Sequence, residues 1–325
     1  MSAIVSTTGS SVAVLGGVGN AAVFGPLSYV YCVGGQQGST YSNVYYSSLS
    51  ATGVGAWTSA NSYPIPIRVS SCTDYGGYVY CIDGINGGGA DVNNVYYAAL
   101  SSGGVGTWAF ASNYPLTEHY HTCAASGGYV YCVGGYTGSV VNNVYYAAVS
   151  GSGTGAWSPT TNYPIPIYDA NCAIYGNVIY CIGGGSSGFA PLTYTYYAPI
   201  SSGGVGAWSL TTPYPANVQD TSCATNAGYI YCVGGSTNGN TNVYYAAVSG
   251  SGIASWTATN SYPVAITSHS CGISGGEIYC IGGAISGSSP TGAVYYAAVS
   301  SAGVGAWTAS NSYPIALRDL RCVIQ

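Results

Sequence analysis

The chain alternates short apolar, aromatic and β-branched segments with clusters of Gly, Asn, Ser and Pro. In one stretch the segments YVYCVGG, NNVYYAAVS and AWSPTT follow one another at short intervals. Short runs of this composition between turn residues are typical of β-strands. A further short segment, which ends at a cysteine, precedes them. The pattern predicts an all-β protein built from repeated four-stranded units.

Six tryptophans mark the length of this repeat. Successive Trp residues lie 51, 49, 51, 48 and 51 positions apart. Four strands in about 50 residues is typical of one blade of a β-propeller. We therefore predict a six-bladed propeller over residues 29–325, preceded by an arm over residues 1–28. The tryptophans are Trp57, Trp108, Trp157, Trp208, Trp256 and Trp307.

The repeat resembles the kelch repeat in three features. A diglycine ends the second strand, a tyrosine lies in the third, and a tryptophan opens the fourth. In the first unit these are Gly34-Gly35, Tyr45 and Trp57, and the second unit departs from them with Asp83-Gly84. The resemblance covers residues 29–323. It implies four-stranded blades whose innermost strands line a central channel.

Ten of the cysteines form pairs with a common spacing. The two members lie nine residues apart, and Gly, Asn or Ala residues occupy the midpoint, as in a two-residue hairpin turn. Counting outward from such a turn places each pair at a non-hydrogen-bonded position, where Cα atoms lie about 4.5 Å apart and a disulfide fits. The predicted bridges are Cys72–Cys81, Cys123–Cys132, Cys172–Cys181, Cys223–Cys232 and Cys271–Cys280.

Cys32 and Cys322 remain. The segment SYPIALRDLRC at the C-terminus matches SYPIPIRVSSC, which ends at Cys72, so it reads as the first strand of a blade that does not continue. A Cys32–Cys322 bridge would complete the first blade from both chain ends and close the ring. Six disulfides indicate an oxidising location, and we expect an extracellular position or one on a cell or virion surface.

Charge is scarce. Charged residues make up 3% of the chain, which contains three arginines and no lysine. This composition excludes nucleic-acid binding through phosphate neutralisation, and also a polybasic membrane anchor. The sequence has no apolar run long enough for a transmembrane helix. A net charge of −5 gives copies little mutual repulsion, which favours self-association.

Most ionisable residues gather in the five positions before the first cysteine of a blade. By the kelch resemblance this is the innermost strand, near one mouth of the channel. His119 and His121, two apart on a strand, would face the same side, as metal ligands could, but no third ligand is identifiable; Asp169, Asp220 and Asp319 share one register. We predict no cofactor and name these five as candidate ligands only. The ten residues are Arg68, Glu118, His119, His121, Asp169, Asp220, His269, Arg318, Asp319 and Arg321.

The N-terminal arm carries no charge, and its middle is apolar on both alternating faces, as in a strand covered on both sides. Exposing its large apolar side chains would cost on the order of 10 kcal/mol. The arm could fold over its own propeller, be a remnant of a targeting segment, or insert into a neighbouring copy. The apolar residues are Val12, Val14, Leu15, Val18, Val23 and Phe24.

Three functions are compatible with these features. The leading hypothesis is a structural subunit of a surface filament or appendage from a microbe or its virus, in which the arm links propellers head to tail. The second is an adhesin or lectin that binds glycans through exposed tyrosines. The third is a propeller enzyme resembling galactose oxidase, but short, similar loops leave no dedicated active-site loop, so we expect no enzymatic activity.

Overall fold

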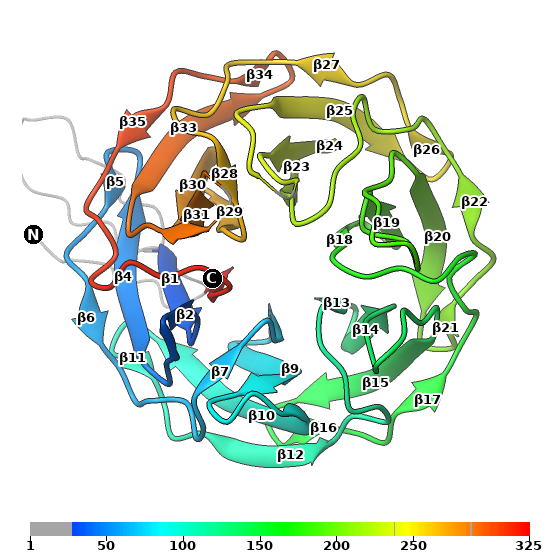
Figure 1. The fold of residues 1–325 in the computed structure, drawn as a ribbon, viewed down its shortest axis with the longest axis horizontal. Coiled ribbons are helices and arrows are strands. Elements are labelled where there is room, and N and C mark those ends of the chain that lie inside the picture. Colours follow the sequence, from blue (N-terminus) through cyan, green and yellow to red (C-terminus); the bar gives the residue numbers. More distant parts are fainter. Residues whose placement is uncertain (1–27, 237, 287) are drawn as a thin grey trace, which may run out of the picture.

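The computed structural model describes residues 28–236, 238–286 and 288–325. The predicted apolar arm residues Val12, Val14, Leu15, Val18, Val23 and Phe24 lie outside the described residues. Six antiparallel sheets surround a central axis, and the chain passes round the ring once (Figure 1). The predicted all-β propeller is confirmed. Within the described residues, no helix is long and apolar enough to span a membrane.

Each blade has the same strand order from the axis outward. In the first blade, β36 (Arg321–Ile324) is innermost, followed by β1 (Ser28–Val33) and β4 (Val44–Ser50). Two short strands, β5 (Gly53–Val54) and β6 (Thr58–Ser59), pair with opposite ends of β4 and form the outer edge. The predicted fourth strand is therefore present but short.

The remaining blades repeat this order. Blade two has β8 (Ser71–Tyr75), β9 (Tyr78–Asn86), β10 (Asp91–Ser101), β11 (Gly104–Val105) and β12 (Ala109–Asn113), with β7 (Ile67–Arg68) pairing with the end of β9. Blade three has β13 (Thr122–Ser126), β14 (Tyr129–Val133), β15 (Val144–Ser150), β16 (Gly153–Thr154) and β17 (Ser158–Pro159). Blade four has β18 (Asn171–Tyr175), β19 (Val178–Ile182), β20 (Thr195–Ser201), β21 (Gly204–Val205) and β22 (Ser209–Leu210).

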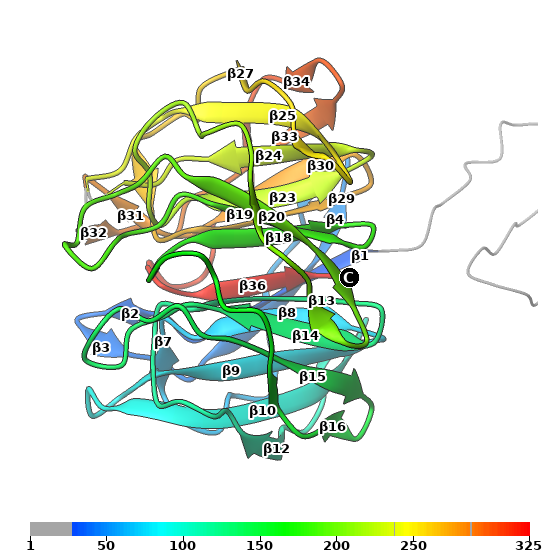
Figure 2. The same cartoon turned by 90° about the vertical axis from the view of Figure 1, so that its right-hand side faces the viewer.

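Blade five has β23 (Ser222–Asn226), β24 (Tyr229–Val233), β25 (Val243–Ser249), β26 (Gly252–Ile253) and β27 (Thr257–Ala258). Blade six has β29 (Ser270–Ser274), β30 (Glu277–Ile281), β33 (Val294–Ser300), β34 (Gly303–Val304) and β35 (Thr308–Ala309). Short loop strands lie at one end of the ring (Figure 2): β2 (Gln36–Gln37), β3 (Ser39–Thr40), β28 (Ile266–Thr267), β31 (Ala284–Ile285) and β32 (Ser289–Pro290).

The cysteines pair as the spacing predicts. In blade two, Cys72 lies opposite Cys81 across the hairpin formed by β8 and β9, and their Cα atoms are 4.1 Å apart. The other hairpin bridges repeat this geometry, since the two-residue turns fix the register. All twelve cysteines are in disulfides, namely Cys32–Cys322, Cys72–Cys81, Cys123–Cys132, Cys172–Cys181, Cys223–Cys232 and Cys271–Cys280.

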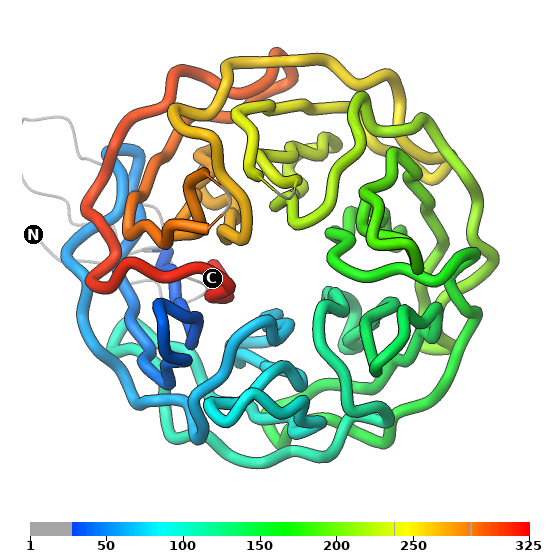
Figure 3. Tube along the Cα trace, in the orientation of Figure 1, coloured from blue at the N-terminus to red at the C-terminus, as the bar shows by residue number. Residues whose placement is uncertain are grey.

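The C-terminal strand closes the ring. β36 pairs with β1 so that Cys32 lies opposite Cys322, with Cα atoms 4.0 Å apart. The C-terminus therefore lies beside the first blade, close to the axis (Figure 3). Each innermost strand contacts the innermost strand on either side, and β36 makes these contacts with β29 and β8. The last strand in the sequence is thus the innermost strand of the first blade.

The core lies between the blades. In the described part of the chain, six hydrophobic clusters form one at each junction of adjacent blades. A buried tyrosine from the second strand of each blade donates a hydrogen bond of 2.8–2.9 Å to a serine carbonyl of the next blade. The sixth, from Tyr279 to Ser50, joins the last blade to the first. These tyrosines therefore pack in the core between blades, and each buried hydroxyl has the hydrogen-bond partner that it needs.

Candidate functional site at the channel mouth

The segment entering each innermost strand has one residue in the left-handed backbone region. This residue lies three positions before the cysteine, and its φ is between 46° and 61°. Such values are uncommon for residues other than glycine, and their recurrence in every blade indicates that the surrounding structure imposes them. We call these residues the mouth ring. They are Val69, Tyr120, Asp169, Asp220, Ser268 and Asp319.

Backbone hydrogen bonds connect the mouth ring from blade to blade. The amide of Asp169 donates to the carbonyl of Tyr120 at 2.9 Å, and the amide of Asp220 donates to Asp169 at 3.0 Å. The amide of Asp319 likewise donates to Ser268 at 3.0 Å. Peptide groups of successive blades are therefore linked to one another around one mouth of the channel. The three aspartates that share a register all belong to this ring.

This geometry corrects the prediction that the ten ionisable residues lie on innermost strands. The left-handed residue ends the extended conformation, so each innermost strand begins one residue before its cysteine. Of the ten, only Arg321 belongs to such a strand, while Arg68 lies in β7. The channel encloses a cavity of about 160 Å³. It is lined from this set by His121, Asp169, Asp220, His269 and Arg321, whereas Arg68, Glu118, His119, Arg318 and Asp319 do not line it.

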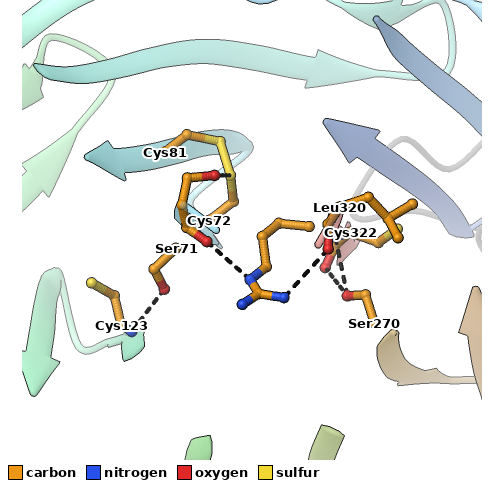
Figure 4. The surroundings of a disulfide bond; sticks show 9 residues. Ser71, Cys72, Cys81, Cys123, Ser270, Leu320 and Cys322 are labelled. Carbon is orange, nitrogen blue, oxygen red and sulfur yellow. Dashed lines mark hydrogen bonds between the residues drawn. A yellow bond between two sulfur atoms is a disulfide. The ribbon is translucent and has the colours of Figure 1, made fainter. Parts of the chain in front are cut away.

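Hydroxyl side chains join the innermost strands below the mouth ring. Ser71, next to the Cys72–Cys81 bridge, accepts a hydrogen bond of 2.8 Å from the amide of Cys123 (Figure 4). Ser270 accepts a hydrogen bond from the amide of Cys322 at 3.1 Å. Because each bond crosses from one blade to the next, the small polar residues beside the cysteines hold the ring together.

Two aspartates, Asp169 and Asp220, line the cavity. Burial, together with Asp220, raises the pKa of Asp169 well above its ordinary value, and the Arg321 guanidinium offsets this only in part. Burial and the neighbouring Asp319 also raise the pKa of Asp220, although Ser268 donates a hydrogen bond of 2.6 Å to its carboxylate. The Arg321 Nε donates to the carbonyl of Ser70 at 2.9 Å. Ionised aspartates are therefore unfavourable here.

This arrangement predicts a pH-dependent gain in stability for Asp169→Asn. Because folding raises the pKa of Asp169, the wild-type protein loses stability as the pH rises above about 4, at about 1.4 kcal/mol per unit of pKa shift. Asparagine cannot ionise and tolerates the left-handed conformation. Thermal unfolding should give equal midpoints at pH 3 and a higher midpoint for the variant at pH 8. A variant less stable than wild type at pH 8 would contradict the raised pKa of the Asp169 carboxyl.

The two histidines predicted to face the same side bind different carboxylates. His119 Nδ1 lies 2.9 Å from Asp91 Oδ1, whereas His121 Nδ1 lies 2.9 Å from Asp83 Oδ1. The prediction is wrong because Tyr120 between them has a φ of 61°, so the chain is not a strand at this point. Burial lowers the pKa of His121 to about 3 and also lowers the pKa of His119.

Glu118 is buried rather than exposed at the mouth. Burial raises its pKa to about 8, with an opposing effect from the Tyr114 hydroxyl. Asp83, which the sequence showed only as a departure from the diglycine, is buried beside it, and burial and Glu118 raise its pKa. Asp83 and Asp91 were missed as site residues. The detectable signal was a charged residue at a position that is glycine in every other blade.

Aromatic side chains cluster at the mouth near blades three and four. The ring of Phe189 lies 5.6 Å from that of Tyr168 and 6.0 Å from that of Tyr136. Tyr120 in turn lies 5.9 Å from Tyr168, whose hydroxyl hydrogen-bonds Gln219 at 3.3 Å. Phe189 is 60% exposed, and its φ is 57°. We call Tyr120, Tyr136, Tyr168 and Phe189 the aromatic cluster.

Together, the fold and the mouth define a disulfide-stapled six-bladed β-propeller whose blades are hydrogen-bonded to one another at one mouth of the channel. No protein-family model matches the chain, and no curated protein sequence matches it. Among solved structures, the one titled "Structure of YjhT" is similar with a TM-score of 0.68. The two chains are 14% identical, and the match covers 86% of this chain and 97% of that one. At this identity the likeness shows the shared propeller fold alone.

Proposed function

We propose that this chain is a structural subunit that joins copies of itself head to tail, through its N-terminal arm, into an extracellular filament or appendage of a microbe or virus. One observation carries the proposal. β36 occupies the innermost position of blade one and pairs with β1 along its length. That side of β1 is therefore occupied by β36 of the same chain, and we infer that the apolar arm needs another surface to cover it.

The two ends of the ring differ in a way that favours head-to-tail contact. The amide of Tyr29 donates to the carbonyl of Gln325 at 2.7 Å, so the chain enters β1 at the end where β36 terminates. The mouth ring lies at the opposite end, where β36 begins. An arm leaving one end and an acceptor at the other would form a heterologous contact, which generates open filaments rather than closed dimers.

The surface and covalent chemistry support the same proposal. With a net charge of −5 and three cationic residues, copies repel one another weakly. Six disulfides indicate an oxidising, extracellular environment. We also propose that the blades are of kelch type, because Gly34-Gly35 follows β1 and Trp57 precedes β6, as the kelch pattern requires.

Sedimentation velocity of the purified full chain tests the self-association. We expect a series of species whose mass increases with protein concentration, because head-to-tail contacts add one copy at a time. A single species of about 33 kDa at every concentration would contradict the proposal. The measurement requires non-reducing conditions, so that ring closure is retained.

The aromatic cluster favours glycan binding as a second candidate function. Exposed aromatic faces beside a few polar groups such as Gln219 are typical of small-ligand sites. We expect Phe189→Ala to abolish binding on a glycan array while leaving the sedimentation pattern unchanged. Phe110→Ala serves as the matched control, because Phe110 is 54% exposed on β12, outside the cluster. Absence of glycan binding by the wild-type chain would remove this candidate.

A further inference from the structure

The six blades can be compared position by position, and two acidic residues have no counterpart in the other five blades. Five positions before the first cysteine of its blade, Glu118 lies where the other five blades have an apolar residue. Two positions after the second cysteine of its blade, Asp83 replaces a glycine. Two positions before the cysteine lies His121, and of the other blades only blade six also has a histidine there, His269. The other blades have Ile67, Ile167, Val218, Ile266 and Leu317 at the first position, and Gly34, Gly134, Gly183, Gly234 and Gly282 at the second.

The fold brings Asp83, Glu118 and His121 to one point. Asp83 comes from β9 of blade two, whereas Glu118 and His121 come from the segment that enters β13 of blade three. One ligand atom from each lies within 4.8 Å of those from the other two. Asp83 and Glu118 are fully buried, and His121 is 3% exposed. Three residues distant in the sequence therefore converge at one junction of blades.

Both carboxylates, those of Asp83 and Glu118, are expected to destabilise the folded state. Asp83 has a φ of 44°, a conformation that glycine adopts in the other five blades. At Gly134 in blade three, a Cβ atom would lie 2.3 Å from the carbonyl oxygen of Ile167. Glu118 places a carboxylate where the other blades bury an aliphatic side chain, and an uncompensated buried charge is strongly unfavourable. Packing therefore gives no reason for either residue.

Two of the donor atoms lack partners within the protein. Among the described residues, nothing hydrogen-bonds Asp83 Oδ2 or His121 Nε2, whereas the Tyr114 hydroxyl interacts with the Glu118 carboxylate. The close contact is between His121 Nδ1 and Asp83 Oδ1, 2.9 Å apart. Buried polar atoms nearly always have a partner, so unpartnered donors that converge in this way indicate a set of cation ligands. Two carboxylates and a neutral imidazole would balance a divalent ion in charge.

We propose that Asp83, Glu118 and His121 bind a divalent transition-metal ion, such as Zn²⁺, that links blade two to blade three. Imidazole nitrogen and carboxylate oxygen are ordinary zinc ligands, at about 2.0–2.2 Å from the ion. Donors bound to one such ion lie within about 4.4 Å of one another, and the donor atoms here all lie within 4.8 Å of one another. Because the site is buried, the ion stabilises the junction rather than reacting with a substrate. The proposal does not depend on the arm.

Zinc content and thermal stability of the full chain test this proposal. After incubation with ZnCl₂ and removal of free ion, mass spectrometry of the metal should give about one zinc per chain. Zinc should raise the unfolding midpoint by several degrees, and EDTA should reverse the rise. Glu118→Ile, which restores the residue type of the other blades, should abolish both effects. His269→Ala is the matched control, because His269 is a buried histidine at the position equivalent to His121.

Two results would overturn the metal site. One is a wild-type chain without bound zinc whose unfolding midpoint is the same in ZnCl₂ and in EDTA, which would leave a proton shared between Asp83 and Glu118. The other is retention of zinc by Glu118→Ile. Should that variant fail to fold, Asp83→Gly supplies the same test, since glycine is the residue of the other blades at that position.

Discussion

Removing the Cys32–Cys322 bridge should destabilise the protein about twice as much as removing any one hairpin bridge. The ring-closing bridge joins residues separated by 290 positions, whereas each hairpin bridge spans 9. In the chain-entropy treatment, these separations correspond to about 5.5 and about 2.5 kcal/mol of stabilisation. The larger loss is expected because β36 would then be held in blade one only by its hydrogen bonds and packing.

Denaturant unfolding of paired serine variants measures this difference. Cys32→Ser with Cys322→Ser is compared with Cys123→Ser with Cys132→Ser, so that neither variant retains a free thiol. Equal losses of unfolding free energy in the two variants would show that the ring-closing bridge stabilises the protein no more than a hairpin bridge does. A larger loss in the hairpin variant would contradict the argument outright.

Deleting residues 1–25 should abolish assembly and leave a folded monomer with all six disulfides. The described ring begins at Ser28 and closes without the deleted segment, so the propeller should retain its fold. If the arm is the link, its removal eliminates the apolar contact between copies. Size-exclusion chromatography under non-reducing conditions should give one peak for the deletion variant, where the full chain gives larger species.

Single substitutions test whether the apolar part of the arm is responsible. Val14→Asp should block assembly at neutral pH, because the joint would bury an unpaired carboxylate. Ser10→Asp adds the same charge just before the apolar segment and should leave assembly intact. Assemblies formed equally well by the deletion variant and the full chain would exclude the arm as the link.

The repeat and the disulfides were predictable because their geometry is local. A two-residue turn fixes which residues face each other across a hairpin, so the spacing of nine between Cys72 and Cys81 determines their pairing. Ring closure followed from comparing the C-terminal segment with the equivalent segment of blade two. These inferences required only sequence distance and internal similarity, which a repeat protein provides.

The channel mouth was predicted less well because its geometry is not local. Alternation along an ideal strand placed His119 and His121 on the same side, but the left-handed Tyr120 redirects the chain. That conformation is held by hydrogen bonds to the neighbouring blade, such as the one from the Asp169 amide to the Tyr120 carbonyl. The partnership of Asp83 with Glu118 was equally hidden, since it forms only when two blades pack together.

Electron cryomicroscopy of the assembled full chain tests the central proposal most directly. We expect rows of propellers stacked with the same polarity, in which residues 12–24 of one copy lie against the next. An extended segment of 20 residues reaches about 65 Å, so the arm is long enough to cross between rings. Propellers that pair face to face, or an arm folded onto the propeller of its own chain, would contradict head-to-tail assembly.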